Sequence, residues 1–554
     1  MASAATATSA MRAPRDRPNI VLVYIDDLGY GDFGYTGHPT TKTPNIDRMA
    51  YEGRVLSTWY SASPVCTASR TALMTGRQPP RVGMPGVINS LNVEGLPLNE
   101  TTLATLLHDG AGYRTMAIGK WHLGQRLQYL PANRGFDEFY GLPFSVDDGT
   151  GFASTCAPHS GADDAGRANA SSADAVGLGP QLPLPLIHQL RPRNRSATHN
   201  VSSLILNQPT NLVPLTADYD AAIGAFFARW FPDAAALAAN PFFLYLAASH
   251  VHTATPNIPN YEQYAGCPFV NTTVRGRFGD ALAEIDWLVG RVVAHVEELG
   301  VANNTLFIVT SDNGPWLMKN QGAGSMGLFT GVSAGYSNTG KGSTWEGGVR
   351  EPALVYWPHQ VPAHTRTSTI VSSMDVLPTL LGLAGVPLPA DRVYDGQDAR
   401  AVWLGTEDDD DAQEKPDGGA SRPTPRFLPL WNNNHYGDVF NAIYACRYGR
   451  FKAHFITSAG LTPGHPAPLT THDPPLVFDV EADPSEAYPL SEADGTLPAG
   501  TVAAILAHKA DAEASLFVRS INMTFGDQWA LCCSWATQPP CHCNTPTVIP
   551  MVPN

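Results

Sequence analysis

Cys66 is the residue of this chain whose neighbours suggest covalent chemistry. It lies in the stretch 63–77, Ser-Pro-Val-Cys-Thr-Ala-Ser-Arg-Thr-Ala-Leu-Met-Thr-Gly-Arg, which predicts a turn followed by a short helix. We expect Thr67 and Ser69 to cap the start of that helix with their side-chain oxygens. The positive end of the helix and the nearby Arg70 would then favour an anion beside Cys66 and lower the pKa of its thiol. The alternatives are a buried, inert cysteine and half of a disulfide.

Two pairs of oxygen-bearing side chains follow apolar runs. The run Asn19 to Ile25 ends in Asp26-Asp27, and the run Leu306 to Thr310 is followed, after one serine, by Asp312-Asn313. Such runs are typical of parallel strands buried on both faces, and α/β folds place their sites at the C-terminal edge of the sheet. Adjacent carboxylates there need a neutralising cation, and hard cations such as Ca²⁺ and Mg²⁺ prefer oxygen ligands. The alternative is a pair of solvated turns rich in Asp, Asn and Gly.

Lysines and histidines that could bind anions or move protons follow other strands. Lys120 and His122 come after a predicted strand, and His250 and His252 follow the apolar run 241–248. Two histidines two residues apart can be metal ligands or acid/base groups. Taken alone, a Lys-x-His pair is more often explained by ordinary polar residues at a strand end.

The order of these motifs resembles that of the formylglycine-dependent sulfatase family. Cys-Thr-Ala-Ser-Arg at 66–70 resembles the signature in which the cysteine is oxidised to formylglycine, with Ala68 where the usual pattern has Pro. Gly-Lys-Trp-His-Leu-Gly at 119–124 resembles the second signature of the family. The two metal motifs and the lysine-bearing segment of the family resemble the segments 24–32, 306–315 and 340–352. The resemblance covers nearly the whole chain from residue 18 and is nearest to the arylsulfatase A subgroup.

The resemblance implies a reaction and a set of site residues. The reaction is hydrolysis of sulfate monoesters (aryl, sugar or lipid sulfates) through a formylglycine made from Cys66 and a divalent cation, Ca²⁺ with Mg²⁺ as the alternative. The implied catalytic residues are Cys66, Arg70, Lys120, His122, His252 and Lys341; the implied substrate contacts are Ser145, His250 and His472; and the implied metal ligands are Asp26, Asp27, Cys66, Asp312 and Asn313.

The same resemblance implies roles for these residues. One hydroxyl of the hydrated aldehyde would attack sulfur, and the other would expel sulfate and restore the aldehyde. The cationic side chains and the metal would neutralise the sulfate, and His252 or Lys341 would protonate the leaving oxygen. His122 would help to deprotonate the second hydroxyl. Two rival functions stay open: a phosphate or phosphonate ester hydrolase on the same scaffold, and a non-catalytic glycoprotein.

The predicted fold is α/β, with a large, mostly parallel central sheet flanked by helices, as in alkaline phosphatase, and a smaller C-terminal α+β subdomain with an antiparallel sheet. The 554 residues, 43% of them hydrophobic, exceed one ordinary core. The expected segments are a leader-like or disordered N-terminus at 1–17, a catalytic domain at 18–405 with an irregular excursion at 149–216, an acidic, Pro/Gly-rich linker at 406–426, and the subdomain at 427–554.

Charge limits the partners that we expect. The chain has 35 basic and 50 acidic residues and a net charge of −15, which argues against nucleic acid and anionic membrane surfaces. We expect no transmembrane segment, because no apolar run reaches about 18 residues. The expected partners are a sulfate-ester substrate and, during maturation, a formylglycine-generating enzyme. The sequence leaves the oligomeric state open, with a homo-oligomer among the alternatives.

Cysteines and glycosylation motifs indicate the compartment. Four of the eight cysteines cluster at 532, 533, 541 and 543, a spacing that favours disulfides over a zinc site. Seven Asn-x-Ser/Thr motifs are present, at Asn99, Asn169, Asn194, Asn200, Asn271, Asn303 and Asn522. We therefore expect a disulfide-bonded glycoprotein that is lysosomal or secreted. Residues 1–17 lack the apolar core of a secretory signal, which is at odds with that expectation.

Overall fold

In the computed structural model of this protein, the apolar runs that precede the site motifs form the centre of one large sheet. The structure describes residues 17–151, 154, 156, 182–192, 201–254, 264–335, 337–407, 425–432, 442–462, 468–516 and 547–548. The four C-terminal cysteines and the acidic run at 408–411 lie outside the described residues.

The described strands are β1 (Asn19–Ile25), β2 (Arg54–Leu56), β3 (Trp59–Tyr60), β4 (Arg114–Lys120), β5 (Glu138–Leu142), β6 (Gly149–Thr150), β7 (Leu182–Pro183), β8 (Leu186–Leu190), β9 (Ser202–Asn207), β10 (Phe242–Ala248), β11 (Thr305–Ser311), β12 (Arg350–Glu351), β13 (Ala353–Tyr356), β14 (Thr365–Thr367), β15 (Val371–Ser372), β16 (Phe427–Asn432), β17 (Ala442–Tyr448), β18 (Phe451–Thr457), β19 (Thr470–Asp479) and β20 (Thr547–Val548). The described α-helices are α1 (Pro44–Glu52), α2 (Cys66–Thr75), α3 (Pro79–Val82), α4 (Leu103–Ala111), α5 (Leu215–Trp230), α6 (Ala234–Ala239), α7 (Gly276–Glu298), α8 (Glu346–Val349), α9 (Val376–Ala384), α10 (Arg400–Leu404) and α11 (Thr501–Ser515).

The central sheet has its parallel strands in the middle. Within the described chain it contains eleven strands in the order β14-β2-β13-β11-β1-β10-β4-β5-β8-β9-β20. The five strands β11, β1, β10, β4 and β5 run parallel to one another, whereas β13 and β8 are antiparallel to their inner neighbours. The C-terminal ends of the five central strands therefore meet at one edge of the sheet. This confirms the predicted α/β class with a large, mostly parallel sheet.

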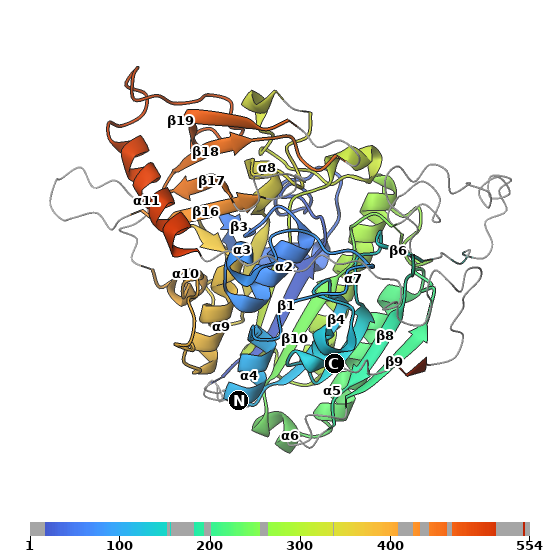
Figure 1. The fold of residues 1–554 in the computed structure, drawn as a ribbon. Helices are drawn as coiled ribbons and strands as arrows, with labels where there is room; N and C mark the ends of the chain where they lie inside the picture. Colours follow the sequence, from blue (N-terminus) through green and yellow to red (C-terminus); the bar gives the residue numbers. More distant parts are fainter. Residues whose placement is uncertain are drawn as a thin grey trace, which may run out of the picture.

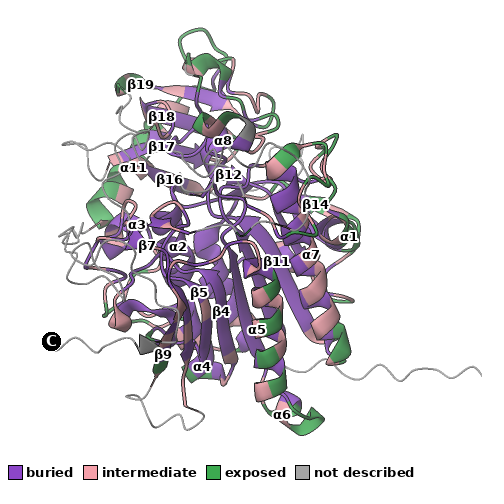
Figure 2. Cartoon of the chain, turned by 90° about the vertical axis from the view of Figure 1, so that its right-hand side faces the viewer, coloured by how far each residue is buried: buried purple, intermediate pink, exposed green. Residues whose placement is uncertain are grey.

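Side chains of β1 alternate between two cores. Val21, Val23 and Ile25 pack with residues of α5 and α7 on one face. Residues Ile20 and Leu22 pack with residues of α4 and α9 on the other face. Since both faces of the strand are covered, a continuous apolar run is what the position requires. Figure 2 shows this buried interior, with the exposed residues of α5 on the outside of the molecule.

The C-terminal part of the chain forms a second, smaller sheet. Strands β16, β17, β18 and β19 are neighbours in that order, and α11 packs against them. The sheet is antiparallel, as predicted. Figure 1 shows this sheet and helix, in orange and red, at one end of the large sheet.

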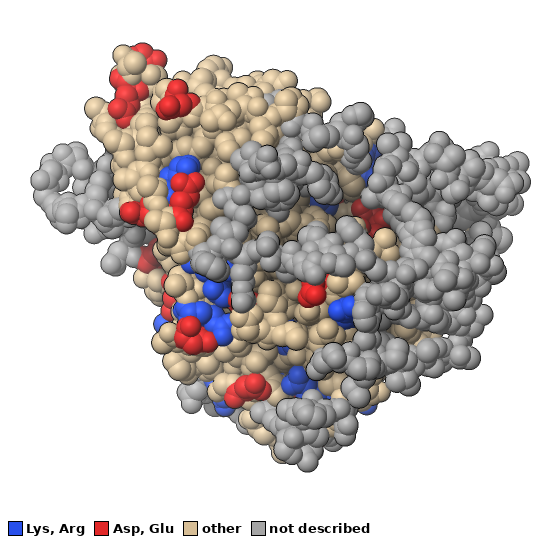
Figure 3. Space-filling model, in the orientation of Figure 1, with Lys and Arg blue, Asp and Glu red and all other residues tan. Residues whose placement is uncertain are grey.

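Surface charges are interspersed on the face drawn in Figure 3, where acidic and basic side chains are scattered over a larger uncharged area.

Part of the segment that was expected to be irregular is regular. Strands β8 and β9 lie within residues 149–216, and β8 extends the central sheet beyond β5. The Ala/Gly/Ser/Pro-rich composition of that segment does not indicate these two strands of five and six residues, because they are stabilised by pairing, β8 with β5 and β9 with β8, rather than by local propensity. The stretch from Arg54 to Tyr60 contributes to two sheets, because β2 joins the central sheet whereas β3 joins a sheet with β12 and β15.

A buried cluster of charges around Glu346, at the start of α8, joins the C-terminal sheet to the small sheet of β3, β12 and β15. Its carboxylate lies 2.8 Å from Lys452 of β18 and 3.0 Å from Arg350, and it accepts a hydrogen bond of 2.7 Å from Tyr60 of β3. Burial opposes ionisation, but Lys452 and Arg350 hold the pKa of Glu346 well below its ordinary value. The carboxylate is therefore charged and links the lysine-bearing segment to the C-terminal subdomain.

We expect Glu346→Gln to lower the free energy of unfolding by about 3 kcal/mol, because it leaves buried cations without their counter-charge. The matched control is Glu513→Gln on α11, which removes a partly exposed pair with Lys509 and should cost under about 0.5 kcal/mol. Denaturant unfolding of both variants measures the difference. Equal effects of the two substitutions would contradict a structural role for the buried cluster.

Candidate active site

Three strand ends bring the predicted motifs together. Ile25 at the end of β1 is paired with Ser311 of β11 on one side and with Ala248 of β10 on the other. The backbone N–H of Asp312 donates to the carbonyl of Ile25 at 3.1 Å, and that of Asp26 donates to the carbonyl of His250 at 2.9 Å. The residues that follow these three strands therefore share one edge of the sheet, as the sequence predicted.

Carboxylates and cations are paired one to one at this edge. The three pairs, all buried, are Lys120 with Asp26 at 2.7 Å, Arg70 with Asp312 at 2.7 Å, and Lys341 with Asp27 at 2.6 Å. Burial acts against ionisation of Asp26, but the positive charges of Lys120, His252 and Arg70 together outweigh it and lower the pKa of Asp26 to about 2. The cluster is thus a set of charged pairs that is close to neutral as a whole.

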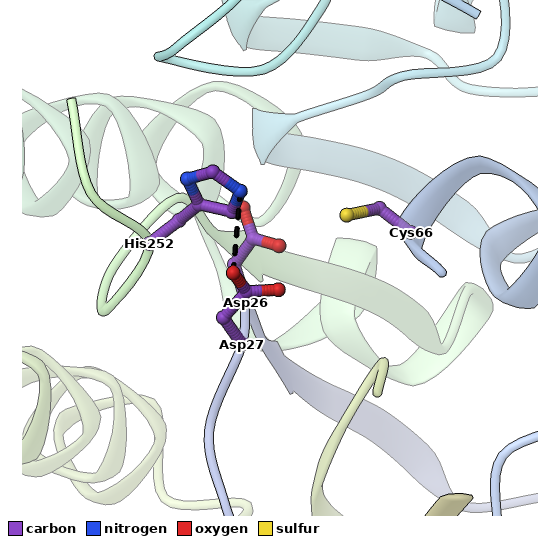
Figure 4. Close-up of side chains that lie close together, drawn as sticks. All are labelled: Asp26, Asp27, Cys66 and His252. Carbon is purple, nitrogen blue, oxygen red and sulfur yellow. Dashed lines mark ion pairs between the residues drawn. The ribbon is translucent and has the colours of Figure 1, made fainter. Parts of the chain in front are cut away.

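Cys66 faces two of these carboxylates and a histidine. It is the first residue of α2, and its side chain is only 2% exposed. One potential ligand atom from each of Asp26, Asp27, Cys66 and His252 lies within 4.8 Å of the others. In Figure 4 the sulfur of Cys66 points across the site toward the carboxylates, and a dashed line marks the ion pair between His252 and Asp27. A group formed on residue 66 would therefore lie beside the acidic cluster.

The expected capping of α2 by Thr67 and Ser69 is wrong. The N-cap residue is Val65, which makes no side-chain cap hydrogen bond. The Thr67 hydroxyl accepts a hydrogen bond from the backbone N–H of Ile88, and the Ser69 hydroxyl is 2.8 Å from that of Tyr24. Because α2 is buried on every side, its hydroxyls bond to neighbouring elements, and the sequence alone does not show which.

His252 and Lys341 form an adjacent pair of nitrogen acids. The Lys341 Nζ is 3.0 Å from the His252 Nε2, which also lies 3.3 Å from the Asp27 carboxylate. The Nδ1 of His252 is 2.8 Å from the carbonyl of Thr253. Burial lowers the pKa of His252, but the carboxylates of Asp147 and Asp27 outweigh it and raise that pKa to about 9. His252 is therefore protonated and lies beside the Lys341 ammonium.

His122 is arranged to accept a proton rather than to donate one. Its Nε2 lies 2.7 Å from the carbonyl of Ile88 and 3.3 Å from the Asp148 carboxylate, so the hydrogen of a neutral ring belongs on Nε2. The Nδ1 is buried and has no hydrogen-bond partner among the described residues, which leaves its lone pair available. Burial and then the Lys120 ammonium lower the pKa of His122, and the ring is therefore neutral.

Two carboxylates in the site were not predicted. Asp147 lies 3.8 Å from His252, and Asp148 contacts His122. Both follow Ser145, whose hydroxyl accepts a hydrogen bond of 3.1 Å from Lys120; its contact with substrate stays a prediction. The signal for Asp147 and Asp148 is a pair of adjacent acids after a strand, as it is for Asp26 and Asp27. Here the strand is β5, at the edge of the parallel set, and the acids do not follow it directly.

Two histidines that the resemblance assigned to substrate lie outside the cluster around Cys66. His250 directs its ring against Tyr264, with ring centres 4.2 Å apart, and its Nε2 is 3.3 Å from Glu284 of α7. His472 lies on β19, where its Nε2 is 2.9 Å from the Thr457 hydroxyl. The substrate contacts of both histidines stay predictions.

Two site residues have an unusual backbone conformation. Asp27 has φ of 56° and His122 has φ of 58°, in the left-handed region that non-glycine residues seldom occupy. Hydrogen bonds hold both: the N–H of Asp27 donates to the Asp312 carboxylate at 3.2 Å, and that of His122 donates to the carbonyl of Pro143 at 3.0 Å. Such conformations cluster at functional sites, where the surroundings impose them.

The C-terminal subdomain holds the lysine-bearing segment in place. The Asn432 side chain at the end of β16 donates to the carbonyl of Gly342 at 2.8 Å, and the N–H of Leu461 donates to the carbonyl of Lys341 at 2.7 Å. The N–H of Gly342 in turn donates to the carbonyl of Pro64, in the turn before Cys66. The position of Lys341 relative to Cys66 thus depends on both parts of the chain.

Comparisons with known proteins agree with this arrangement. The sulfatase family model matches residues 18–386, and the model for the C-terminal region of aryl-sulfatase matches residues 424–543. The chain is 37% identical to arylsulfatase A of Bos taurus over 97% of both chains, and 39% identical to arylsulfatase A of Homo sapiens over 85% of this chain and 83% of the relative. The PsFucS1 sulfatase from Pseudoalteromonas sp. has a similar structure, with a TM-score of 0.68, 28% identity, and coverage of 90% of this chain and 92% of that one.

The chain therefore belongs to the sulfatase family. It is a sulfuric ester hydrolase of the arylsulfatase type, and the gathered carboxylates, cations and histidines are its candidate active site.

Proposed function

We propose that this protein hydrolyses sulfate monoesters of aryl, sugar or lipid alcohols through a formylglycine made from Cys66, with a divalent cation held by the acidic cluster. The observation that carries the proposal is the position of Cys66, buried at the start of α2 with its thiol facing Asp26, Asp27 and His252. A formylglycine-generating enzyme would supply the modification. Once hydrated, an aldehyde at residue 66 supplies one hydroxyl to attack sulfur and a second to expel sulfate.

The residues present fit a hard divalent cation. The Oδ1 atoms of Asp26 and Asn313 are buried and accept no hydrogen bond from any described residue. Unsatisfied buried oxygens are costly, and a cation that prefers oxygen ligands relieves that cost. Asp26, Asp27, Asp312, Asn313 and the group at residue 66 would hold Ca²⁺ or Mg²⁺, which would polarise the sulfate and favour ionisation of the attacking hydroxyl.

The charge of the cluster supports this assignment. The three carboxylates of Asp26, Asp27 and Asp312 are balanced by one lysine or arginine each. A divalent cation, a singly charged sulfate ester and one ionised hydroxyl together add no net charge to that arrangement. The site therefore suits a monoanionic ester, because each added charge has a partner inside a buried site.

The side chains of this chain have complementary tasks in the proposed reaction. Arg70, Lys120 and Lys341 are fixed cations that neutralise charge spreading over the sulfate oxygens. Lys341 and His252 hold protons beside the same carboxylate and can deliver one to the leaving oxygen. His122, neutral and with a free Nδ1 lone pair, can accept the proton of the second hydroxyl.

We expect kcat/KM for 4-nitrophenyl sulfate to exceed that for 4-nitrophenyl phosphate by about 100-fold at pH 7. Most of the phosphate ester is a dianion at that pH, and the extra charge has no counter-charge in the cluster. Initial rates of nitrophenol release, with the two esters at equal concentration, give the ratio. Equal rates, or a preference for phosphate, would replace the proposal with the rival phosphate or phosphonate ester hydrolase.

We also propose maturation in an oxidising compartment, with function in the lysosome or outside the cell. A disulfide joins Cys156 to Cys267, and such bonds persist in oxidising environments. The glycosylation motifs that fall on described residues, at Asn99, Asn271 and Asn303, all have exposed asparagines. Among the described helices, none combines the length and the apolar character needed to cross a bilayer.

A further inference from the structure

Trp316 forms a fixed wall beside the proposed proton donors. It comes directly after the segment 306–315, which resembles a metal motif, and it is 8% exposed. Its indole N–H donates to the carbonyl of Leu461 at 3.0 Å, which ties the ring to the C-terminal subdomain. The centre of the ring is 5.7 Å from that of His252. A substrate that reaches His252 therefore passes close to this ring.

Two lysines lie over the same indole ring. The Lys341 ammonium is 5.0 Å from the ring centre, and the Lys319 ammonium is 4.1 Å from it. The two ammonium groups are therefore no more than 9.1 Å apart, the sum of those two distances. Electrostatic attraction between an ammonium group and an aromatic face helps to fix the position of the cation. Lys319 is thus a second positive charge of defined position next to Lys341.

Lys319 differs from Lys341 in its access to solvent. Lys341 is buried and is paired with Asp27 at the centre of the site. Lys319 is half-buried and lies in the loop that follows Asp312 in the sequence. The Lys319 ammonium interacts electrostatically with the site: burial lowers its pKa, and the Asp147 carboxylate opposes that effect. An anion that meets Lys319 would therefore lie just outside the position where Lys341 meets the sulfate.

We infer that Lys319, held on Trp316, is a specificity-determining residue that binds a second acidic group of the substrate. The preferred substrates would then be sulfate esters that carry a neighbouring carboxylate or second sulfate on the same alcohol. The inference rests on the proposed sulfatase function and adds a substrate class to it. A positioned cation is needed for such substrates because the chain as a whole carries a charge of −15, which repels polyanions.

The test compares two esters with the same reacting group, 4-nitrophenyl sulfate and 2-carboxy-4-nitrophenyl sulfate. In Lys319→Ala we expect kcat/KM for the carboxylated ester to fall about tenfold and that for the plain ester to change less than about twofold, in line with a charge-assisted hydrogen bond at a partly exposed site. Lys319→Arg should keep most of the preference, because it keeps the positive charge. Dividing the ratio of the two esters in the variant by the same ratio in the unaltered enzyme cancels the difference in their leaving groups.

The matched control is Lys509→Ala on α11, where another lysine lies over an aromatic ring, 5.2 Å from the centre of Phe455. We expect it to leave the ratio between the esters unchanged. An equal loss for both esters in Lys319→Ala, or no loss for either, would overturn the inference while leaving the sulfatase proposal intact. Failure of the unaltered enzyme to release sulfate from 4-nitrophenyl sulfate would instead overturn the proposed function on which it rests.

Discussion

Cys66→Ala is expected to lower sulfate ester hydrolysis by at least about 10⁴-fold, the largest effect of any single substitution in this chain. Alanine lacks the thiol that the modifying enzyme oxidises, so its methyl carbon is not converted to an aldehyde and the proposed nucleophile is not formed. The side chain is small and its removal leaves the cation–carboxylate pairs intact, so the fold should persist. Initial rates with 4-nitrophenyl sulfate, together with the thermal unfolding midpoint, separate the two effects.

Cys446→Ala is the matched control for that substitution. Cys446 is the other free, buried cysteine of the described chain, and it lies on β17 of the C-terminal subdomain. Its loss should reduce stability by about 1 kcal/mol or more, as for other truncations of buried side chains, and should leave kcat nearly unchanged. If Cys66→Ala kept more than a tenth of the activity, the nucleophile would have to lie elsewhere.

Asp26→Asn is expected to weaken cation binding and to lower kcat/KM by about 10³-fold. The substitution replaces a charged ligand oxygen by a neutral one and leaves Lys120 without its counter-charge. In the unaltered protein, Ca²⁺ at 100 times its Kd should stabilise the folded state by about 2.7 kcal/mol and raise the unfolding midpoint. That rise should be absent in Asp26→Asn, which gives a readout of binding that does not depend on activity.

Asp32→Asn provides the control, because Asp32 is an acid of the same motif with a structural position. Its buried carboxylate accepts hydrogen bonds from the N–H groups of Gly29 and Ser325, both at 2.7 Å, and pairs with Arg275. We expect this variant to lose about 3 kcal/mol of stability while its midpoint still rises with Ca²⁺. A normal Ca²⁺ response in Asp26→Asn would contradict the proposed cation site.

The parts of the site that the sequence predicts are those that follow long buried strands. β1, β10 and β11 are buried along their whole length and mostly apolar, so their ends and the residues that follow, such as Asp26 and Asp312, could be located from composition alone. Parallel pairing then brings these ends together without further information. Assigning formylglycine chemistry to Cys66 required the resemblance to a family, because a cysteine at a helix start has several ordinary explanations.

The parts that the sequence does not predict depend on contacts between distant segments. Lys319 lies over Trp316 three residues earlier, but the contact of Trp316 with His252 brings together the segments that follow β11 and β10, which are distant in the sequence. The disulfide between Cys156 and Cys267 joins residues 111 positions apart, and nothing local marks them as partners. The hydroxyls of Thr67 and Ser69 are similar cases, since their partners belong to other elements.

The measurement that tests the central claim most directly is mass spectrometry of the tryptic peptide from Val55 to Arg70, from protein made in a host with a formylglycine-generating enzyme. The account predicts that residue 66 has lost its thiol and gained an aldehyde, despite the alanine at position 68. An intact thiol in protein that nevertheless hydrolyses 4-nitrophenyl sulfate would contradict it, because the reaction would then proceed without the proposed nucleophile.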